Sequence, residues 1–168
     1  MIIRVWHPGF IQWPGGAARC ALGRGGISND KREGDGATPA GTFPLRRVFY
    51  RADRMTKPVT ALPARQLRPH DGWCDASGDP AYNMLIERPF PGSHEKLWRP
   101  DSLYDVIVEI GYNDDPVRQE LGSAIFMHIA RENYKATEGC IALAQEDLLR
   151  LLRRCDIDTR LVIGGRPR

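Results

Sequence analysis

Short apolar runs separated by turn residues are the main pattern along the chain. In Leu103–Tyr112, alternate residues are apolar while Asp105 and Glu109 fall on the other face, so the pattern predicts a strand with one buried and one solvated face. The run Ala124–Ala130 is apolar on both faces, which is typical of a central strand, and it contains His128. Five further strands are predicted, at Ile2–Val5, Arg19–Leu22, Phe43–Arg51, Tyr82–Glu87 and Arg160–Ile163.

Helical periodicity is confined to a few segments. Ala144–Arg154 places four leucines on one side, with acidic residues in its first turn and arginines in its last, an order that the helix dipole favours. A second, short helix is predicted at Pro116–Leu121. The polar, aperiodic stretches Thr56–Pro69 and Arg88–Asp101 are predicted to be long loops, and such loops are candidates for the walls of a binding site.

Composition supports a mostly β fold. The 168 residues include 17 Gly and 13 Pro, which favours many short strands joined by turns over long helices. No repeat or long linker divides the sequence, so we expect a single domain over residues 1–168, mostly β with few helices (α+β). No apolar run approaches the roughly 18 residues of a spanning helix, so the domain is not expected to span a membrane.

The charge pattern does not favour a nucleic-acid partner. There are 24 basic and 21 acidic side chains, a formal net charge of +3. Arg46, Arg47, Arg51 and Arg54 have neither interleaved aromatic residues nor zinc-finger spacing beside them. They are interpreted as a solvated strand face, which would still favour an anionic polymer at the cell surface.

The four cysteines contain no C-x-x-C pair, which argues against a zinc ribbon or a thioredoxin motif. They are interpreted as unpaired thiols at Cys20, Cys74, Cys140 and Cys155.

The strongest chemical signal is His128 followed twelve residues later by Cys140. A thiol with an ordinary pKa of about 8.5 is only slightly ionised at neutral pH, so a working cysteine needs a base such as this imidazole. Gly139 would let the backbone approach closely and turn N–H groups toward a developing oxyanion. The pattern predicts a nucleophile and its general base.

Two other interpretations of this pair stay open. Cys140 can be a packed thiol and His128 a core histidine bonded to a carbonyl, because free cysteine is among the most buried residue types. A metal site is a weaker alternative, because its ligands would be irregularly spaced. It would combine His128 and Cys140 with one of His7, His70 or His94.

Three stretches, taken in order, resemble the L,D-transpeptidase (YkuD-like) catalytic domain. They are G-D-G-x-T-P-x-G-x-F over 34–43, the strand that carries His128, and Gly-Cys-Ile over 139–141 before a C-terminal helix. The resemblance covers roughly residues 20–163 and implies a β-sandwich or barrel-like fold with a helix following the cysteine. It also implies that Cys140 attacks peptidoglycan stem peptides between an L- and a D-centre and becomes acylated as a thioester. In that scheme His128 accepts the thiol proton, or holds it in an ion pair, and then protonates the departing amine, with no metal or organic cofactor.

The resemblance further implies residues that line a peptide groove, although without it packing is the more frequent role of tryptophans such as Trp73 and Trp98. These residues are Trp73, Tyr82, Asn83, Trp98, Arg99, Tyr112, Asn113, Arg131, Thr137 and Glu138.

The cysteine motif departs from the family pattern Ser-His-Gly-Cys-(Ile/Val)-Arg. Thr137, Glu138 and Ala142 stand at its first, second and last places. The missing guanidinium can be replaced by Arg131, Arg99 or Lys135. A carboxylate at Glu138 would oppose thiolate formation if it is close, and otherwise it points to solvent or selects an amine-bearing acceptor.

The implied products are peptidoglycan crosslinks, either 3-3 or a nonstandard linkage such as 1-3. If water replaces the amine, the same site is an L,D-carboxypeptidase that trims muropeptides. A noncatalytic peptidoglycan-binding module is a third possibility, and it would not be acylated by the carbapenems that modify many family members. The periplasm is the expected location, although no leader is visible, and a cytoplasmic enzyme acting on recycled muropeptides is the alternative.

Overall fold

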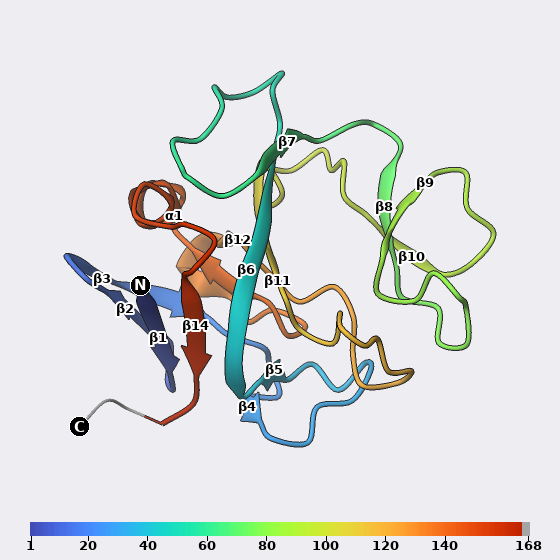
Figure 1. The fold of residues 1–168 in the computed structure, drawn as a ribbon, viewed down its shortest axis with the longest axis horizontal. Helices are drawn as coiled ribbons and strands as arrows, with labels where there is room; N and C mark the ends of the chain where they lie inside the picture. Colours follow the sequence, from blue (N-terminus) through green and yellow to red (C-terminus); the bar gives the residue numbers. More distant parts are fainter. Residues whose placement is uncertain (166–168) are drawn as a thin grey trace.

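The computed structural model describes residues 1–165, which are built mainly from short strands with one α-helix and one 3-10 turn (Figure 1). The mostly β class with few helices is confirmed. In chain order the elements are β1 (Ile2–Trp6), β2 (Phe10–Trp13), β3 (Gly16–Ala21), β4 (Ile27–Ser28), β5 (Thr38–Pro39), β6 (Gly41–Tyr50), β7 (Ala64–Gln66), β8 (Asp71–Cys74), β9 (Leu85–Glu87), β10 (His94–Lys96), β11 (Val106–Ile110), β12 (Phe126–Ile129), η1 (Glu132–Tyr134), β13 (Ile141–Leu143), α1 (Gln145–Leu152) and β14 (Arg160–Ile163).

The main sheet closes on itself. Nine strands follow the order β11-β12-β13-β3-β2-β1-β14-β6-β7, and β11 also pairs with β6. Closure is possible because β6 is long: Gly41–Pro44 pairs with β14, and Leu45–Tyr50 pairs with β11. Figure 1 shows β6 running through the centre of the molecule. The result is a barrel-like ring of eight strands with β7 attached outside, a closure that removes exposed strand edges.

The alternation of side chains along the strands creates two cores, one inside the ring and one on its outer face. On β12, Met127 and Ile129 belong to the inner core, whereas Phe126 belongs to the outer one. Helix α1 adds leucines such as Leu148 to the inner core. Because residues two apart share a face, His128 lies on the outer side with Phe126.

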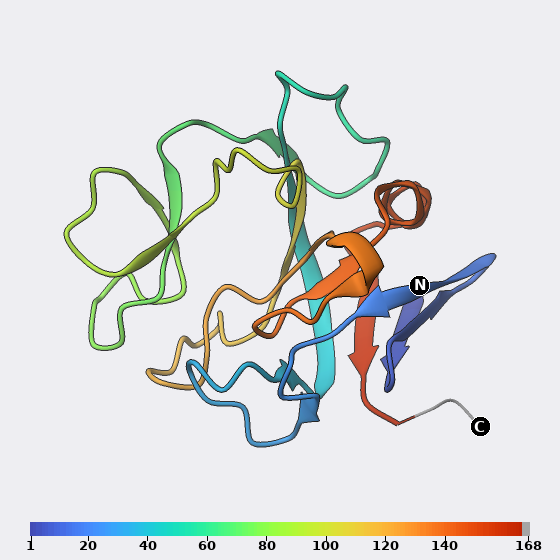
Figure 2. The same cartoon turned by 180° about the vertical axis from the view of Figure 1, so that it is seen from behind.

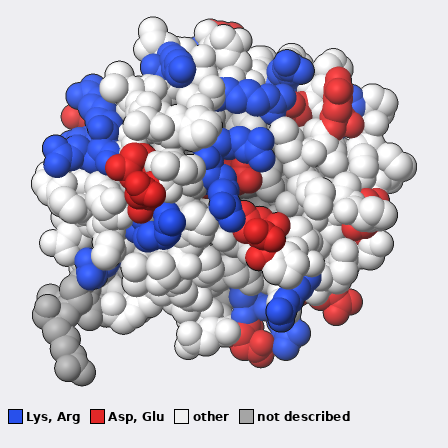
Figure 3. Space-filling model, viewed as in Figure 1, with Lys and Arg blue, Asp and Glu red and all other residues white. Residues whose placement is uncertain are grey.

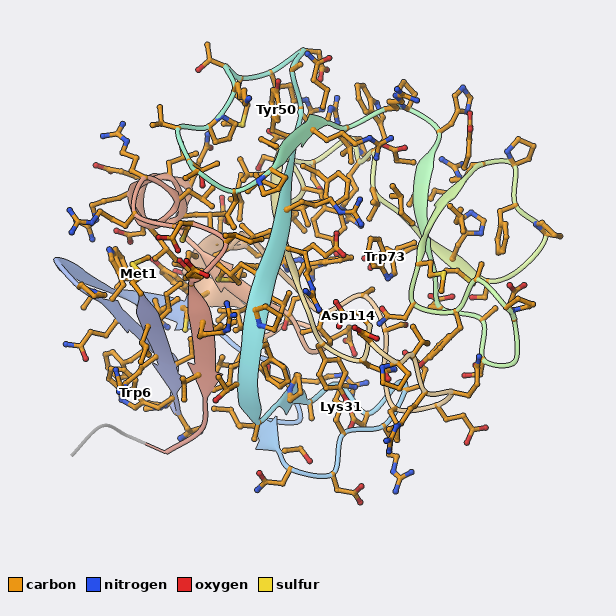
Figure 4. The ribbon with its side chains drawn as sticks, in the orientation of Figure 1. Met1, Trp6, Lys31, Tyr50, Trp73 and Asp114 are labelled. Atoms are coloured by element: carbon orange, nitrogen blue, oxygen red, sulfur yellow. The ribbon has the colours of Figure 1, made fainter. Side chains whose placement is uncertain are left out.

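A second sheet covers this outer core. Strands β10, β8 and β9 pair in that order, and we call them the cover sheet (right side of Figure 1). Trp73 of β8 points toward the main sheet (Figure 4) and packs edge-on against Phe126, with ring centroids 5.1 Å apart. Leu97, Leu103 and Tyr104 fill the rest of the space. A cavity forms at the edge of this outer core (Figure 2 shows the same elements from behind).

Most predicted strands are present with shifted ends, and the predicted C-terminal helix is α1. Five strands, β2, β4, β5, β8 and β13, were not predicted, and the two predicted loops contain the short strands β7 and β10. The predicted strand Tyr82–Glu87 is shortened to β9, because Tyr82 and Asn83 lie in a turn where Asn83 has φ +58°.

The predicted helix at Pro116–Leu121 is wrong, because this segment consists of turns. The Asn113 side chain bonds both the amide and the carbonyl of Arg118, at 2.8 Å each, and so holds the chain in a loop.

The predicted solvated face of Leu103–Tyr112 is also wrong. Glu109 and Asp105 are buried, and they pair with Arg47 and Arg54. Strand β11 is flanked by β12 and β6 in the closed sheet and is covered on its outer side, so both of its faces are buried.

The arginine cluster is not a uniformly solvated face either. Arg51 is 4% exposed and is held by Asp53 and by the carbonyl of Arg99. Acidic and basic side chains are interspersed on the face shown in Figure 3. No helix of the described residues combines the length and apolar character needed to cross a bilayer.

Candidate active site

His128 and Cys140 are brought together by the parallel pairing of β12 with β13. His128 is in register with Ala142, so Cys140, two residues earlier, is level with Phe126. Residues two apart on a strand point to the same side, and both functional side chains therefore face the outer core. Both line one cavity of about 410 Å³.

The thiol of Cys140 is held between two backbone groups. Its Sγ accepts a hydrogen bond from the amide of Phe126 at 3.4 Å and donates one to the carbonyl of Ala124 at 3.2 Å. Burial, and after it the charge of Glu95, raises the pKa of Cys140, while the Phe126 amide and Lys31 act in the opposite direction, and the net result is a pKa of about 12. The resting group at neutral pH is a neutral thiol.

The imidazole of His128 is oriented by the backbone. Its Nδ1 lies 2.8 Å from the carbonyl oxygen of Ile129, which makes Nδ1 the protonated nitrogen and leaves Nε2 as an acceptor. Tyr104 packs edge-on against the ring at 5.2 Å between centroids. Burial lowers the pKa of His128 to about 4, so the imidazole is neutral at neutral pH.

The resting site therefore contains a neutral thiol and a neutral imidazole with a free nitrogen. These protonation states would favour proton transfer as the sulfur attacks over a preformed thiolate–imidazolium pair.

Gly139 occupies a position that only glycine fits. Its φ is +138°, and a Cβ there would lie 2.8 Å from the carbonyl oxygen of Ala37 and 3.1 Å from Cδ1 of Ile125. The backbone before Cys140 is thus pressed against the loop that contains the Gly-Asp-Gly motif.

Asp35 holds that loop in shape. Its Oδ1 accepts hydrogen bonds from Nζ of Lys31 at 2.6 Å and from the amide of Ala37 at 2.8 Å, and its Oδ2 accepts one from the amide of Arg32 at 2.7 Å. This one carboxylate therefore accepts three of the hydrogen bonds that hold residues 31–37.

Four of the predicted substrate-binding residues line the cavity: Arg99, Arg131, Thr137 and Glu138. Thr137 donates to the carbonyl of Cys140 at 2.6 Å, which shapes the turn around the cysteine. Glu138 is exposed and pairs with Arg24 at 2.8 Å.

The position of the missing family arginine is filled by the buried Ala142. All three residues considered as its replacement, Arg99, Arg131 and Lys135, line the cavity.

The other predicted substrate-binding residues do not line this cavity in the described part of the chain. Several of them brace the loops behind it instead. Asn83 donates to the carbonyls of Tyr112 and Asn113 at 3.0 and 2.8 Å, and its Oδ1 accepts from the amide of Ala124, the residue whose carbonyl holds the Cys140 thiol.

Tyr82 donates to Glu33, and Tyr112 donates to the carbonyl of Leu121. Trp98 lies under the guanidinium of Arg51, 3.6 Å from ring centroid to Cζ. Trp73 lines a neighbouring cavity of about 840 Å³, together with Asn83.

Several cavity residues were not predicted. Glu95 and Tyr104 are the most notable, because the Tyr104 hydroxyl donates to Oε1 of Glu95 at 2.6 Å and both face the cysteine–histidine pair. The remaining members are Lys31, Glu33, Gly34, Asp75, Leu103, Ser123, Ala124 and Ala136. The only available signal was that Arg88–Asp101 is a long loop that could form a wall, and both Glu95 and Arg99 come from it.

Within residues 1–165, no group of three or more His, Cys, Asp or Glu side chains could hold a metal ion. The alternative metal site therefore lacks a third ligand there. The four cysteines are unpaired and buried.

The fold and this pair of residues define a mostly β protein with a thiol–imidazole site on the outer face of a barrel-like sheet. The family model YkuD, described as the L,D-transpeptidase catalytic domain, matches residues 11–163. The chain therefore belongs to that family, and the resemblance inferred from its motifs is confirmed over nearly the whole sequence. Comparisons with curated proteins and with solved structures found no match.

Proposed function

We propose that the protein is a cysteine-dependent L,D-transpeptidase that acts on peptidoglycan stem peptides through a thioester on Cys140. The observation that carries the proposal is that Cys140 and His128 line one cavity, with the Nδ1 of His128 committed to the carbonyl of Ile129 and its Nε2 left to exchange a proton.

In the first half-reaction, His128 takes the thiol proton as Sγ of Cys140 attacks the carbonyl carbon at the L-centre. The resulting tetrahedral intermediate collapses when the C–N bond breaks and the imidazolium returns its proton to the departing amine. The products are a thioester, a free amine and a neutral imidazole.

In the second half-reaction, an amine of a neighbouring stem attacks the thioester carbonyl. His128 accepts a proton from the attacking nitrogen and delivers it to the departing sulfur, which restores the thiol and leaves a new amide bond. A 3-3 crosslink, or a nonstandard one such as 1-3, is the product. With water as the nucleophile, the same steps give an L,D-carboxypeptidase.

The charges around the cavity suit a peptide with free ends. Arg131 and Lys135 offer positive charge for a carboxylate, while acidic side chains including Glu95 lie on other parts of the wall. Mature peptidoglycan lies outside the cytoplasmic membrane, so we propose the periplasm as the place of action.

The test is incubation of the purified protein with muropeptides, followed by mass spectrometry. Dimers indicate transfer, and shortened monomers indicate hydrolysis. Cys140→Ala is expected to give neither product, and Cys20→Ala, which alters a thiol of the inner core, is the matched control.

A second measurement addresses the noncatalytic alternative. Incubation with a carbapenem is expected to add the mass of one drug molecule to the wild type and none to Cys140→Ala. If the wild type gives neither a muropeptide product nor an adduct, the proposed function is wrong.

A further inference from the structure

Two carboxylates of the cover sheet form part of the wall of the catalytic cavity. Glu95 of β10 is paired in register with Trp73 of β8, and Asp75 follows two residues after that tryptophan. By strand alternation all three lie on the side of the cover sheet that faces the main sheet. Glu95 and Asp75 both line the cavity that contains Cys140.

Neither carboxylate has a cationic partner in the described residues. Glu95 accepts one hydrogen bond, from the hydroxyl of Tyr104. Oδ1 of Asp75 is buried, and no hydrogen-bond donor within residues 1–165 reaches it. Arg99 also lines the cavity, but its guanidinium is bonded twice to Asp101, at 2.9 and 2.6 Å.

The charge of Arg99 favours the ionised form of Glu95, but its guanidinium is already bonded to Asp101, so a further positive charge would stabilise the two carboxylates. Burial raises the pKa of Glu95 and the nearby charge of Asp75 acts in the same direction, while the hydrogen bond from Tyr104 and the charge of Arg99 act in the opposite one. Buried carboxylates are normally paired, and a buried acceptor without a donor destabilises the protein. A metal ion is not favoured, because among residues 1–165 no third ligand accompanies the two groups.

The negative charge of Glu95 also acts on the nucleophile. After burial, it is the next largest cause of the raised pKa of the Cys140 thiol. A cation bound at Glu95 would cancel that effect and make the thiol easier to ionise.

We propose that Glu95 and Asp75 bind a primary ammonium group of the donor peptide, next to the scissile L–D bond, and that this contact promotes the attack of Cys140. The inference rests on the proposed function. The ammonium belongs to the donor, because the acceptor amine must lose its positive charge before it attacks. Recognition of the donor and activation of the sulfur are then one event, and the free enzyme keeps a poorly reactive thiol.

The test uses Glu95→Gln, which keeps an oxygen for the Tyr104 hydroxyl and removes the charge. Glu87→Gln is the matched control, because Glu87 is an exposed carboxylate on β9 of the same sheet. Two synthetic donors are compared, one with a free primary amine beside the L–D bond and the same peptide with that amine acetylated. Donor consumption is followed by mass spectrometry.

Two changes of opposite sign are expected in Glu95→Gln. The KM for the free-amine donor rises about tenfold or more, while that for the acetylated donor is unchanged. Alkylation of Cys140 by iodoacetamide in the free enzyme, followed at the peptide that contains it, becomes several-fold faster. Glu87→Gln changes neither quantity. A merely structural role for Glu95 would not combine faster alkylation with weaker use of one donor.

Asp75→Asn provides a second variant if Glu95→Gln does not fold, and it is expected to raise the KM for the free-amine donor in the same selective way. The inference is wrong if a folded variant keeps the wild-type preference for the free-amine donor. Failure of the proposed function is distinguishable, because the wild type would then consume neither donor and form no carbapenem adduct.

Discussion

The backbone amide of Phe126 donates a hydrogen bond to the sulfur of Cys140 at 3.4 Å. Strand β12 therefore contributes two groups to the site. The amide of its first residue, Phe126, lowers the pKa of the Cys140 thiol, and the side chain of its third residue, His128, is the proposed base. Both contributions are fixed by the backbone register between β12 and β13. The first predictions concern the residues that this register brings together.

Replacement of the sulfur is expected to remove turnover. Cys140→Ala should lose all measurable activity, and Cys140→Ser should lose at least about 100-fold, because a hydroxyl is much harder to ionise. Muropeptide turnover and thermal unfolding are the measurements. Cys20→Ala should keep turnover and lose about 1 kcal/mol of stability, because its thiol belongs to the inner core. Substantial activity in Cys140→Ala would exclude the nucleophilic role.

The buried imidazole should make stability depend on pH. Burial lowers the pKa of His128 from 6.5 to about 4, so the unfolded chain binds this proton more tightly than the folded one. As the pH falls from 6.5 toward 4, the free energy of unfolding should decrease, by at most about 1.4 kcal/mol per pH unit from this group. Urea unfolding of the wild type and of His128→Gln at several pH values measures the difference. Parallel curves for the two proteins would contradict a neutral buried histidine.

The same lowered pKa sets the acid limit of catalysis. A histidine that must accept a proton loses activity only when it is already protonated, so kcat/KM for the acetylated donor, which does not use Glu95, should stay level on acidification until the pH approaches 4. A pH–rate profile on protein shown to remain folded is the measurement. A midpoint near 6.5 would show that the imidazole is solvated in the free enzyme.

Gly139 should tolerate substitution poorly. Gly139→Ala combines a φ of +138° with a Cβ that would lie 2.8 Å from a backbone oxygen, so we expect a loss of about 2–4 kcal/mol and little turnover. Gly78→Ala is the control, because Gly78 also has a positive φ, +89°, but nothing lies within 4 Å of its Cβ position. Its loss should be smaller, roughly 1–2 kcal/mol, with turnover retained. Equal effects in the two variants would mean that the contact with Ala37 is unimportant.

Asp35 should be needed for the loop that supports Gly139. Asp35→Ala removes three hydrogen bonds and leaves the buried Lys31 without its carboxylate, so we expect a loss of about 2–4 kcal/mol. Asp30→Ala removes an exposed pair with Arg32 and should change stability by less than about 0.5 kcal/mol. Chemical denaturation of the two variants, side by side, tests the difference.

The sequence predicted correctly those elements whose structure depends on residues close together in the chain. The apolar run around His128 predicted a central strand, and the leucines of 144–154 predicted the helix, because both patterns repeat within a few residues. The family resemblance followed from the order of short motifs around Asp35, His128 and Cys140, and the family match confirms it.

Features that depend on distant contacts were not predictable. The sequence pattern predicted that Glu109 faces solvent. It is buried because the sheet closes, and its charge is paired with Arg47, 62 residues away in the sequence. Glu95 lies in a segment without periodicity, and only the placement of the cover sheet brings it to the cavity. The segment Pro116–Leu121, where a helix was expected, is instead a loop in which the Asn113 side chain donates one hydrogen bond to the backbone of Arg118 and accepts another from it.

The position of β14 has a consequence for how the protein is made. This strand lies between β1 and β6, and Ile2 pairs with Arg160, so a newly synthesised chain cannot complete the ring until residues 160–163 have left the ribosome. Until then the edges of β1 and β6 present unpaired N–H and C=O groups, which are templates for aggregation. Dependence on chaperones is therefore expected to last until β14 is available to pair with both strands.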